Sequence, residues 1–219
     1  MSIRIGIYDF FAYTIPGGFY LLTIAYLCLI SGLATIDFQS LSNPSIVQAI
    51  VVAILAYIAG LVFDPIAQPW YRLFKPKSFS KKVLDEFKES YTDLEIKFQA
   101  RDWPVLLAYL RRENIDIAAD IEKLNATNIM LRNASFNLVI LSVIQIIQYI
   151  RTGFFAWNLV LCFVFLISSI IAGRESIKRV TWFYLGIYEA ITARSLELSD
   201  LLVRKQEVAS RDTERSSEE

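Results

Sequence analysis

The sequence of 219 residues contains no histidine, and this absence removes many kinds of catalytic and metal site. Histidine is the commonest general base and a frequent metal ligand at neutral pH. The two cysteines, Cys28 and Cys162, form no metal or redox motif, so we expect them to pack as small apolar residues. No carboxylates cluster with the spacing of metal ligands. We therefore predict that the protein is not an enzyme and that it uses no cofactor and no metal.

Charge is also scarce in two long stretches of the chain. Residues 10–63 contain one charged side chain, Asp37, and residues 133–173 contain only Arg151. The chain as a whole is 55% hydrophobic, with a mean hydropathy of +0.43. This is more apolar surface than a soluble domain of this length usually buries, so the two stretches are predicted to be hydrophobic hairpins in a membrane.

Each hairpin holds two apolar segments of roughly 17 to 21 residues, which is the length needed to cross a hydrocarbon core of about 30 Å. We place the spans at residues 16–35, 45–63, 134–150 and 154–173. They predict an all-α, polytopic membrane protein with four transmembrane helices and a small cytoplasmic helical layer. No Asp, Glu, Lys or Arg lies in the middle of a span, which argues against an ion-coupled pump.

The distribution of basic residues predicts the orientation. Residues 64–134 hold 12 of the 22 Lys and Arg side chains, and residues 174–219 hold 8. By the positive-inside rule, both termini and the central segment are cytoplasmic, and the membrane is the cell inner membrane. The expected parts of the chain are an interfacial segment with the first hairpin (1–63), a cytoplasmic helical segment (64–133), the second hairpin (134–173), a cytoplasmic C-terminal helix (174–208) and a disordered tail (209–219).

The first span opens with Pro16, Gly17 and Gly18, residues that rarely occur together inside a helix. Proline is favoured at the first position of a helix, and Thr14 upstream offers a hydroxyl cap, so we expect the helix to start near Pro16 and to pack closely there. A hinge is a less favoured alternative. A ligand cradle is disfavoured, because the Lys-Ser/Thr pair of a phosphate-binding loop is missing.

Small residues recur every three or four positions along the second span. They are Ala49, Ala53, Ala56 and Gly60, a pattern that lets two helix backbones approach closely. The partner is either the first span of the same chain or a neighbouring subunit. The third span carries Ser142, Gln145 and Gln148 on one face. We favour hydrogen bonding between helices as their role over a polar path for water or ions assembled by oligomerisation.

The central segment begins with Pro65, Pro69 and Pro76, which we expect to prevent one continuous helix. Its aromatic residues Trp70, Tyr71 and Phe74 are expected among lipid headgroups. A lipid-facing basic patch follows, made of Arg72, Lys75, Lys77, Lys81 and Lys82. Attraction to anionic lipid and plain positive-inside topology explain this patch equally well.

Further along, apolar residues at helical spacing predict three short helices. The second is expected to start after a cap at Asp102, and the third to run from about Ile115 into the third span. In the C-terminal segment a stripe with 3-4 spacing comprises Ile177, Val180, Tyr184, Ile187, Ile191, Leu198 and Leu201. The stripe is either a coiled-coil seam between subunits or a surface that covers the central helices, and we favour the second.

Three stretches, "IYDFFAYTIPGGFYLL", "AYIAGLVFDPI" and "NIMLRNASFNLVILSVIQ", carry a resemblance to known proteins. The chain resembles a loose group of small prokaryotic four-span proteins that share a Tyr-Asp-x-Phe-x-Tyr-x-x-Pro-Gly opening. Some members resemble membrane components of antiviral defence operons, including the membrane partner in Kiwa-type systems. The resemblance implies that Tyr8, Asp9, Tyr13, Pro16 and Gly17 form the family signature, and it carries no catalytic motif.

Two functions are consistent with these features. The first is a sensor or effector of anti-phage defence with a cytoplasmic partner, which responds by perturbing membrane permeability. The second is a non-conducting anchor or scaffold subunit for a soluble partner. In either case we expect contact with membrane lipids, a homo-oligomer and a cytoplasmic protein partner, and no direct binding of nucleic acid. A neighbouring nuclease or nucleotide-signal synthase gene would favour the first function, and a cell-envelope operon the second.

Overall fold

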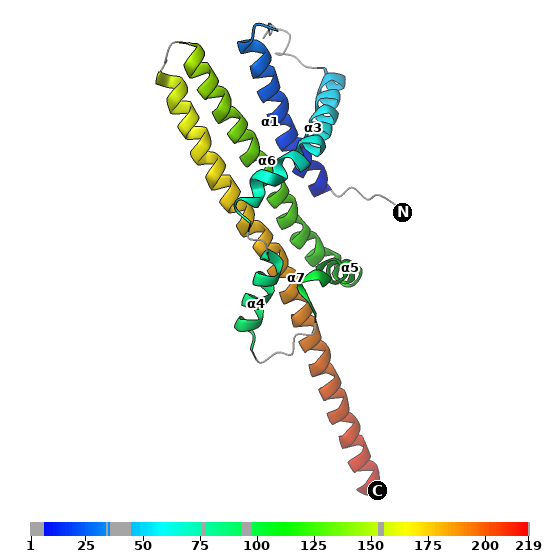
Figure 1. Cartoon of the computed structure of the whole chain (residues 1–219). Helices are drawn as coiled ribbons and strands as arrows, with labels where there is room; N and C mark the ends of the chain where they lie inside the picture. Colours follow the sequence, from blue (N-terminus) through cyan, green and yellow to red (C-terminus); the bar gives the residue numbers. More distant parts are fainter. Residues whose placement is uncertain are drawn as a thin grey trace. The chain divides into compact units, whose positions relative to one another are not determined.

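The computed structural model describes residues 7–33, 35, 45–75, 78–92, 98–152 and 156–218, with side chains up to Arg194. These residues contain six α-helices and no strand, which confirms the all-α class (Figure 1). Four of the helices are long and apolar enough to cross a membrane, within Phe10–Ile30, Ile46–Arg72, Ile115–Arg151 and Ala156–Arg194. The predicted multi-pass membrane protein with four spans is therefore confirmed.

The chain divides into two compact units. Unit 1 comprises residues 1–77 and 122–181, and unit 2 comprises residues 78–121 and 182–219. Helices α6 (Ile115–Arg151) and α7 (Ala156–Glu218) contribute to both units. This division differs from the expected one, because residues 64–77 and 122–133 belong with the membrane spans rather than with the other central residues.

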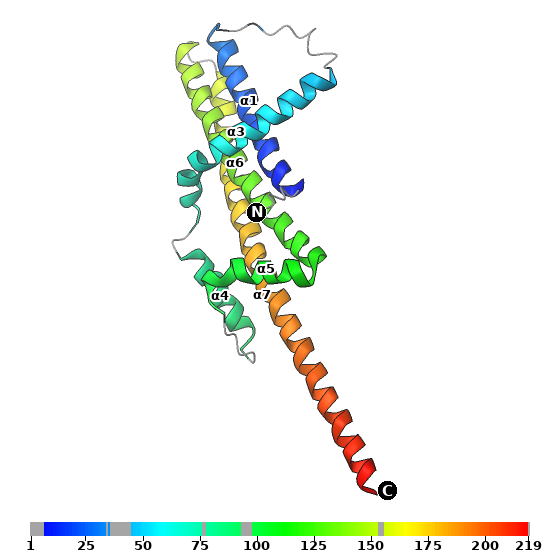
Figure 2. The ribbon, with the colours of Figure 1, turned by 90° about the vertical axis from the view of Figure 1, so that its right-hand side faces the viewer.

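In unit 1, α1 (Ile7–Ile30) crosses α3 (Ile46–Arg72), as Figure 2 shows. The side of α3 turned away from the other helices is rich in exposed Ile, Val and Leu; Ile46 is 80% exposed and Val52 58%. Such a surface is stable against lipid hydrocarbon and unstable against water. The exposed apolar face of α3 is therefore a lipid-contacting surface.

Both proline-containing segments are helical, contrary to the sequence prediction. α1 starts at Ile7, and Pro16 lies inside it and is buried. Thr14 does not cap this helix; its hydroxyl donates to the Phe10 carbonyl oxygen one turn back, at 2.7 Å. α3 likewise continues through Pro65 and Pro69. Membrane helices tolerate proline because side-chain hydroxyls and packed neighbours compensate the lost backbone bond.

Residues 78–92, 98–121 and 182–194 of unit 2 form a small helical layer with an aromatic core. It consists of α4 (Phe79–Ser90), the 3-10 turn η1 (Ala100–Asp102), α5 (Trp103–Glu113) and the adjoining parts of α6 and α7. Phe87 of α4 lies 5.7 Å from Tyr188 of α7, and Trp103 of α5 lies 5.5 Å from Phe183, centroid to centroid. Ring pairs at these distances pack favourably.

The C-terminal stripe covers the central helices, as we favoured, over the part that lies in unit 2. Tyr184 and Ile187 are buried, and Tyr184 contacts Phe79 of α4. Arg194, which interrupts the stripe, pairs with Glu113 of α5 at 2.8 Å. The side chains of Leu198 and Leu201 lie outside the described residues.

Two other boundaries differ from those expected. The Asp102 side chain does not cap α5; it accepts from the Gln99 backbone N–H at 2.8 Å and closes η1 instead. α7 continues to Glu218, past the expected end at Val208 and into the segment that was expected to be disordered. The expected continuation of the third short helix into the third span is confirmed by α6.

Candidate functional site

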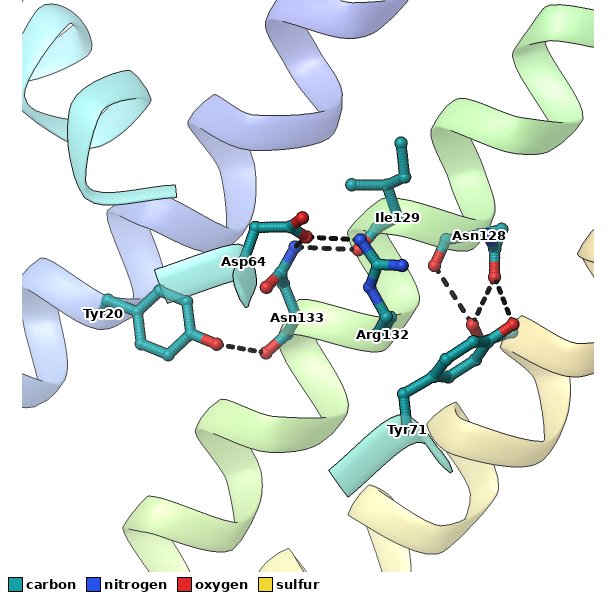
Figure 3. Close-up of polar contacts among 8 residues, drawn as sticks. Tyr20, Asp64, Tyr71, Asn128, Ile129, Arg132 and Asn133 are labelled. Atoms are coloured by element: carbon teal, nitrogen blue, oxygen red, sulfur yellow. Dashed lines mark hydrogen bonds and ion pairs between the residues drawn. The ribbon is translucent and has the colours of Figure 1, made fainter. Parts of the chain in front are cut away.

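The most strongly polar site of unit 1 is a buried ion pair between two membrane helices. Arg132 of α6 donates from Nη2 to Oδ1 of Asp64 of α3 at 2.5 Å, and their side chains are only 10% and 17% exposed (Figure 3). Asn133, next along α6, donates to the same carboxylate oxygen at 2.7 Å. One carboxylate oxygen thus accepts two hydrogen bonds from α6, which fixes α3 against it.

The site extends to α1 through Tyr20. The Tyr20 hydroxyl donates to the backbone carbonyl oxygen of Asn133 at 2.9 Å, and the residue is almost completely buried. Its ring stacks on Phe63 of α3, with centroids 4.2 Å apart. α1 is therefore held at the same level as the ion pair by a hydrogen bond to α6 and a ring contact with α3.

On its other side the site reaches α7. Ser176 of α7 donates to Oδ1 of Asn128 at 2.7 Å, and the Tyr71 hydroxyl of α3 donates to the same oxygen at 3.2 Å. The Arg132 guanidinium carbon lies 5.5 Å from the centroid of the Tyr71 ring, within reach of a cation–π interaction. We call these seven residues the polar network: Tyr20, Asp64, Tyr71, Asn128, Arg132, Asn133 and Ser176.

The polar network links all four membrane helices of unit 1 (Figure 3). Two of its buried polar atoms, Nε of Arg132 and Oδ1 of Asn133, have no hydrogen-bond partner among the described residues. Ionisable residues inside membrane segments are rare and are usually functional. The network contains no histidine or cysteine, and the described residues contain no cluster suited to a metal ion. Its chemistry is therefore charge pairing and hydrogen bonding between helices.

A second set of polar contacts joins α6 to α7 at seven-residue intervals. Ser135 donates to the Ser169 carbonyl oxygen at 2.8 Å, and Ser169 returns a bond to the Ser135 carbonyl oxygen at 2.7 Å. Asn128 with Ser176 lies one interval away on one side, and Ser142 with Cys162 one interval away on the other. We call these three pairs the polar seam. Small polar residues at this spacing let two antiparallel helices approach closely along their length.

The structure brings together four of the six residues predicted for helix packing. A Cβ on Gly17 would collide with the Ala56 carbonyl group and lie 2.7 Å from the Gly60 nitrogen, and a Cβ on Gly60 would collide with the Tyr13 carbonyl group. Pro16 is buried beside Gly17. The partner of this small-residue surface is therefore the first span of the same chain. Ala49 is exposed and Ala53 only half-buried, so these two contribute less.

The residues considered for a polar path point into the bundle of their own chain. Ser142 is buried and donates to the Cys162 carbonyl oxygen of α7 at 3.2 Å. Gln145 is buried and donates to the Tyr26 hydroxyl of α1 at 3.1 Å. Gln148 is half-buried. Because Ser142 and Gln145 bond to two different helices of the bundle, the arrangement favours the interhelical hydrogen bonding that we expected.

The residues predicted for a lipid-facing basic patch are divided between the two units. Arg72 and Lys75 belong to unit 1, Lys81 and Lys82 belong to unit 2, and Lys77 lies outside the described residues. Burial lowers the pKa of the Lys75 ammonium below its ordinary value, and the Arg132 charge acts in the same direction.

The aromatic residues beside this patch make contacts with protein. The Trp70 indole N–H donates to Ser135 of α6 at 2.9 Å, and Tyr71 is buried in the polar network. Phe74 lies against Gly173 of α7, close enough that a Cβ there would come within 2.9 Å of its ring. These three side chains extend the contact of α3 with α6 and α7.

Sequence analysis did not identify the polar network, although two signals pointed to it. Asp64 directly follows the second expected span, and Arg132 lies two residues before the third. Opposite charges at the ends of two spans are able to pair if the spans pack side by side.

No family model matches the chain, and neither a curated protein nor a solved structure similar to it was found.

Proposed function

We propose that the chain is an inner-membrane sensor of prokaryotic antiviral defence, with both termini in the cytoplasm, which acts with a cytoplasmic protein partner. One observation supports this proposal most directly. Three stretches carry the resemblance to the group of small four-span proteins, of which some members resemble defence components. These stretches contribute Tyr20, Asp64, Arg132 and Asn133, and the four residues meet in the polar network. Segments far apart in the sequence thus meet in one buried site, so the parts of the chain that carry the resemblance form one structural unit.

The role of the signature residues in this proposal is helix packing. Pro16 and Gly17 lie at the crossing with α3, and the Tyr13 backbone lies against Gly60. Tyr8 is partly exposed, and the Asp9 side chain lies outside the described residues. The proposed partner-binding part is unit 2, which the charge distribution assigns to the cytoplasm and which α6 and α7 connect to the membrane bundle.

The defence role is tested by phage challenge. We expect cells that express the chain together with its neighbouring genes to reduce plating of at least one phage tenfold or more, and an early stop codon in this chain to abolish the protection. Plating that stays unchanged across a broad phage panel, with the protein present in the membrane fraction, would contradict the defence role.

A non-conducting anchor is the second candidate, and the inward orientation of Ser142 and Gln145 favours it over ion leakage. An anchor would hold a soluble partner at the membrane through unit 2. The partner encoded beside this chain should then leave the membrane fraction when the chain is deleted. Homo-oligomerisation remains a proposal in both candidates.

Replacement of Gln145 and Gln148 by leucine separates conduction from helix packing. We expect cells with the double variant to keep the same membrane potential as cells with the wild type. The variant should lose about 0.6–2 kcal/mol of stability, because one interhelical hydrogen bond is removed. Gln148→Leu alone is the matched control and should be near neutral, because within the described part of the chain its side chain makes no hydrogen bond. A wild-type depolarisation that the double variant abolishes, with its assembly intact on native gels, would contradict this expectation.

A further inference from the structure

Unit 2 contains a surface hollow that no part of the proposed function uses. It has a volume of about 340 Å³ and lies between α4 and η1. Its lining residues are Lys81, Leu84, Asp85, Lys88, Gln99, Ala100 and Arg101. Small-molecule sites occupy clefts of about 300 Å³ upwards, so this hollow is large enough for a small metabolite.

The side chains that line the hollow include more cations than anions. Lys81 and Lys88 of α4 and Arg101 of η1 line it, opposed by one carboxylate, Asp85. Lys81, Asp85 and Lys88 are spaced four and three residues apart, which places them on one face of α4. Three cations converge on the hollow, which thus carries more positive than negative charge and attracts anions.

Among the described residues, no ion pair holds either of the two lysines. Neither Lys81 nor Lys88 forms an ion pair with a described residue, whereas Lys82 on the neighbouring face pairs with Glu86 at 3.6 Å. Nε of Arg101 lies 4.0 Å from Oδ1 of Asp102, which is a long contact for an ion pair. Oδ2 of Asp102 accepts a hydrogen bond from the Gln99 N–H instead. The guanidinium therefore retains most of its donors for a ligand.

The floor of the hollow is apolar. Leu84 is buried and Ala100 half-buried, while the Gln99 side chain offers an amide at the edge. A few cationic groups around a small apolar floor suit a ligand that has both a compact organic part and negative charge. Lysine and arginine are the residues that proteins use most for phosphate groups, as point charges and as bidentate forks respectively.

We propose that this hollow binds a small ligand that carries two or more phosphate charges, such as a nucleotide. The ligand's phosphates contact Lys81, Lys88 and Arg101, and its organic part covers Leu84 and Ala100. The proposal does not depend on the defence role. A phosphate of an anionic lipid headgroup offers the same chemistry, and the experiment distinguishes the two sources.

Calorimetric titration of the full chain with ATP tests the site. The protein is reconstituted in nanodiscs of zwitterionic phosphatidylcholine, and we expect saturable binding that weakens as salt is raised. The triple variant Lys81→Ala, Lys88→Ala, Arg101→Ala should bind at least tenfold more weakly. Lys82→Ala is the matched control, because Lys82 neighbours Lys81 on α4 but does not line the hollow, and it should bind ATP as the wild type does.

A second arm identifies the source of the phosphate. The titration is repeated in nanodiscs that contain anionic phosphatidylglycerol. Unchanged ATP binding identifies a soluble ligand as the occupant, and ATP binding that is lost in these nanodiscs identifies the lipid headgroup. The absence of saturable ATP binding in phosphatidylcholine would overturn the proposal, as would equal binding by the wild type and a triple variant with unchanged thermal unfolding.

Discussion

Replacement of Asp64 by alanine should destabilise the membrane bundle by about 3 kcal/mol, since removing one partner of a buried ion pair typically costs about 3–5 kcal/mol. The reason is that Arg132, with a side chain only 10% exposed, would keep its charge with no carboxylate to compensate it. A guanidinium does not lose its proton in proteins, so it has no route to neutrality. Thermal unfolding of the purified protein in a fixed detergent measures the loss.

Replacement of Arg132 by alanine removes the other partner of the ion pair. Comparison with Asp64→Ala separates the cost of a buried unpaired charge from the cost of the lost contacts. Arg132→Ala should be milder than Asp64→Ala, because the Asp64 carboxylate keeps its hydrogen bond from Asn133. Glu86→Ala in unit 2 is the control for an exposed pair with Lys82 and should change stability by less than about 0.5 kcal/mol. Equal, small effects of Asp64→Ala and Glu86→Ala would show that the polar network contributes no stability.

The membrane character of this chain was predictable because hydropathy is a local property. Each span is a run of apolar residues long enough for a bilayer, and a single sequence contains all the information needed to find it. The charge-poor stretches around Asp37 and Arg151 marked the four helices that are long and apolar enough to cross a membrane. The small residues Ala56 and Gly60 lie at the α1–α3 crossing, and their regular spacing is also a local signal, because close helix packing requires small residues at regular intervals.

Helix ends near proline were not predictable in the same way. The rule that places Pro16 at the start of a helix comes from proteins in water, where an unpaired carbonyl is readily hydrated. In α1 and α3 the helix nevertheless continues through Pro16 and Pro65, and Pro16 is buried against neighbouring helices. Such burial depends on neighbours that a local pattern does not contain.

The polar network was missed for a different reason. Asp64 and Arg132 are 68 positions apart, and each alone resembles an ordinary charge at the end of a span. Their pairing follows only when α3 is known to pack against α6. The polar seam was in principle accessible, because Asn128, Ser135 and Ser142 recur at exact seven-residue spacing, as do Cys162, Ser169 and Ser176. Ser142 also shares a face with Gln145 and Gln148 at three-residue spacing, and the sequence prediction followed that shorter pattern instead of the seven-residue one.

Replacement of Gly60 by alanine should separate α1 from α3 and destabilise the bundle by about 3 kcal/mol, the upper end of the range for overpacking. The added Cβ would collide with the Tyr13 carbonyl group and lie 3.0 Å from the Tyr13 Cα. These are backbone atoms of α1, which cannot move aside as a flexible side chain would. Gly60→Leu should be more damaging and should reduce the amount of folded protein in the membrane.

Gly18→Ala is the matched control, because it makes the same chemical change in a membrane helix without a collision. A Cβ on Gly18 has no neighbouring atom within 4 Å, so alanine there should be neutral or stabilising by about 0.5–1 kcal/mol, because it lowers the backbone entropy of the unfolded chain.

The double variant Gly17→Ala with Gly60→Ala should lose less stability than the sum of the losses of the two single variants. Both methyl groups force the same two backbones apart, so once the first has separated the helices the second meets a wider gap. Thermal unfolding of the four variants measures these differences, and full additivity, or equal behaviour of Gly60→Ala and Gly18→Ala, would contradict a close α1–α3 crossing.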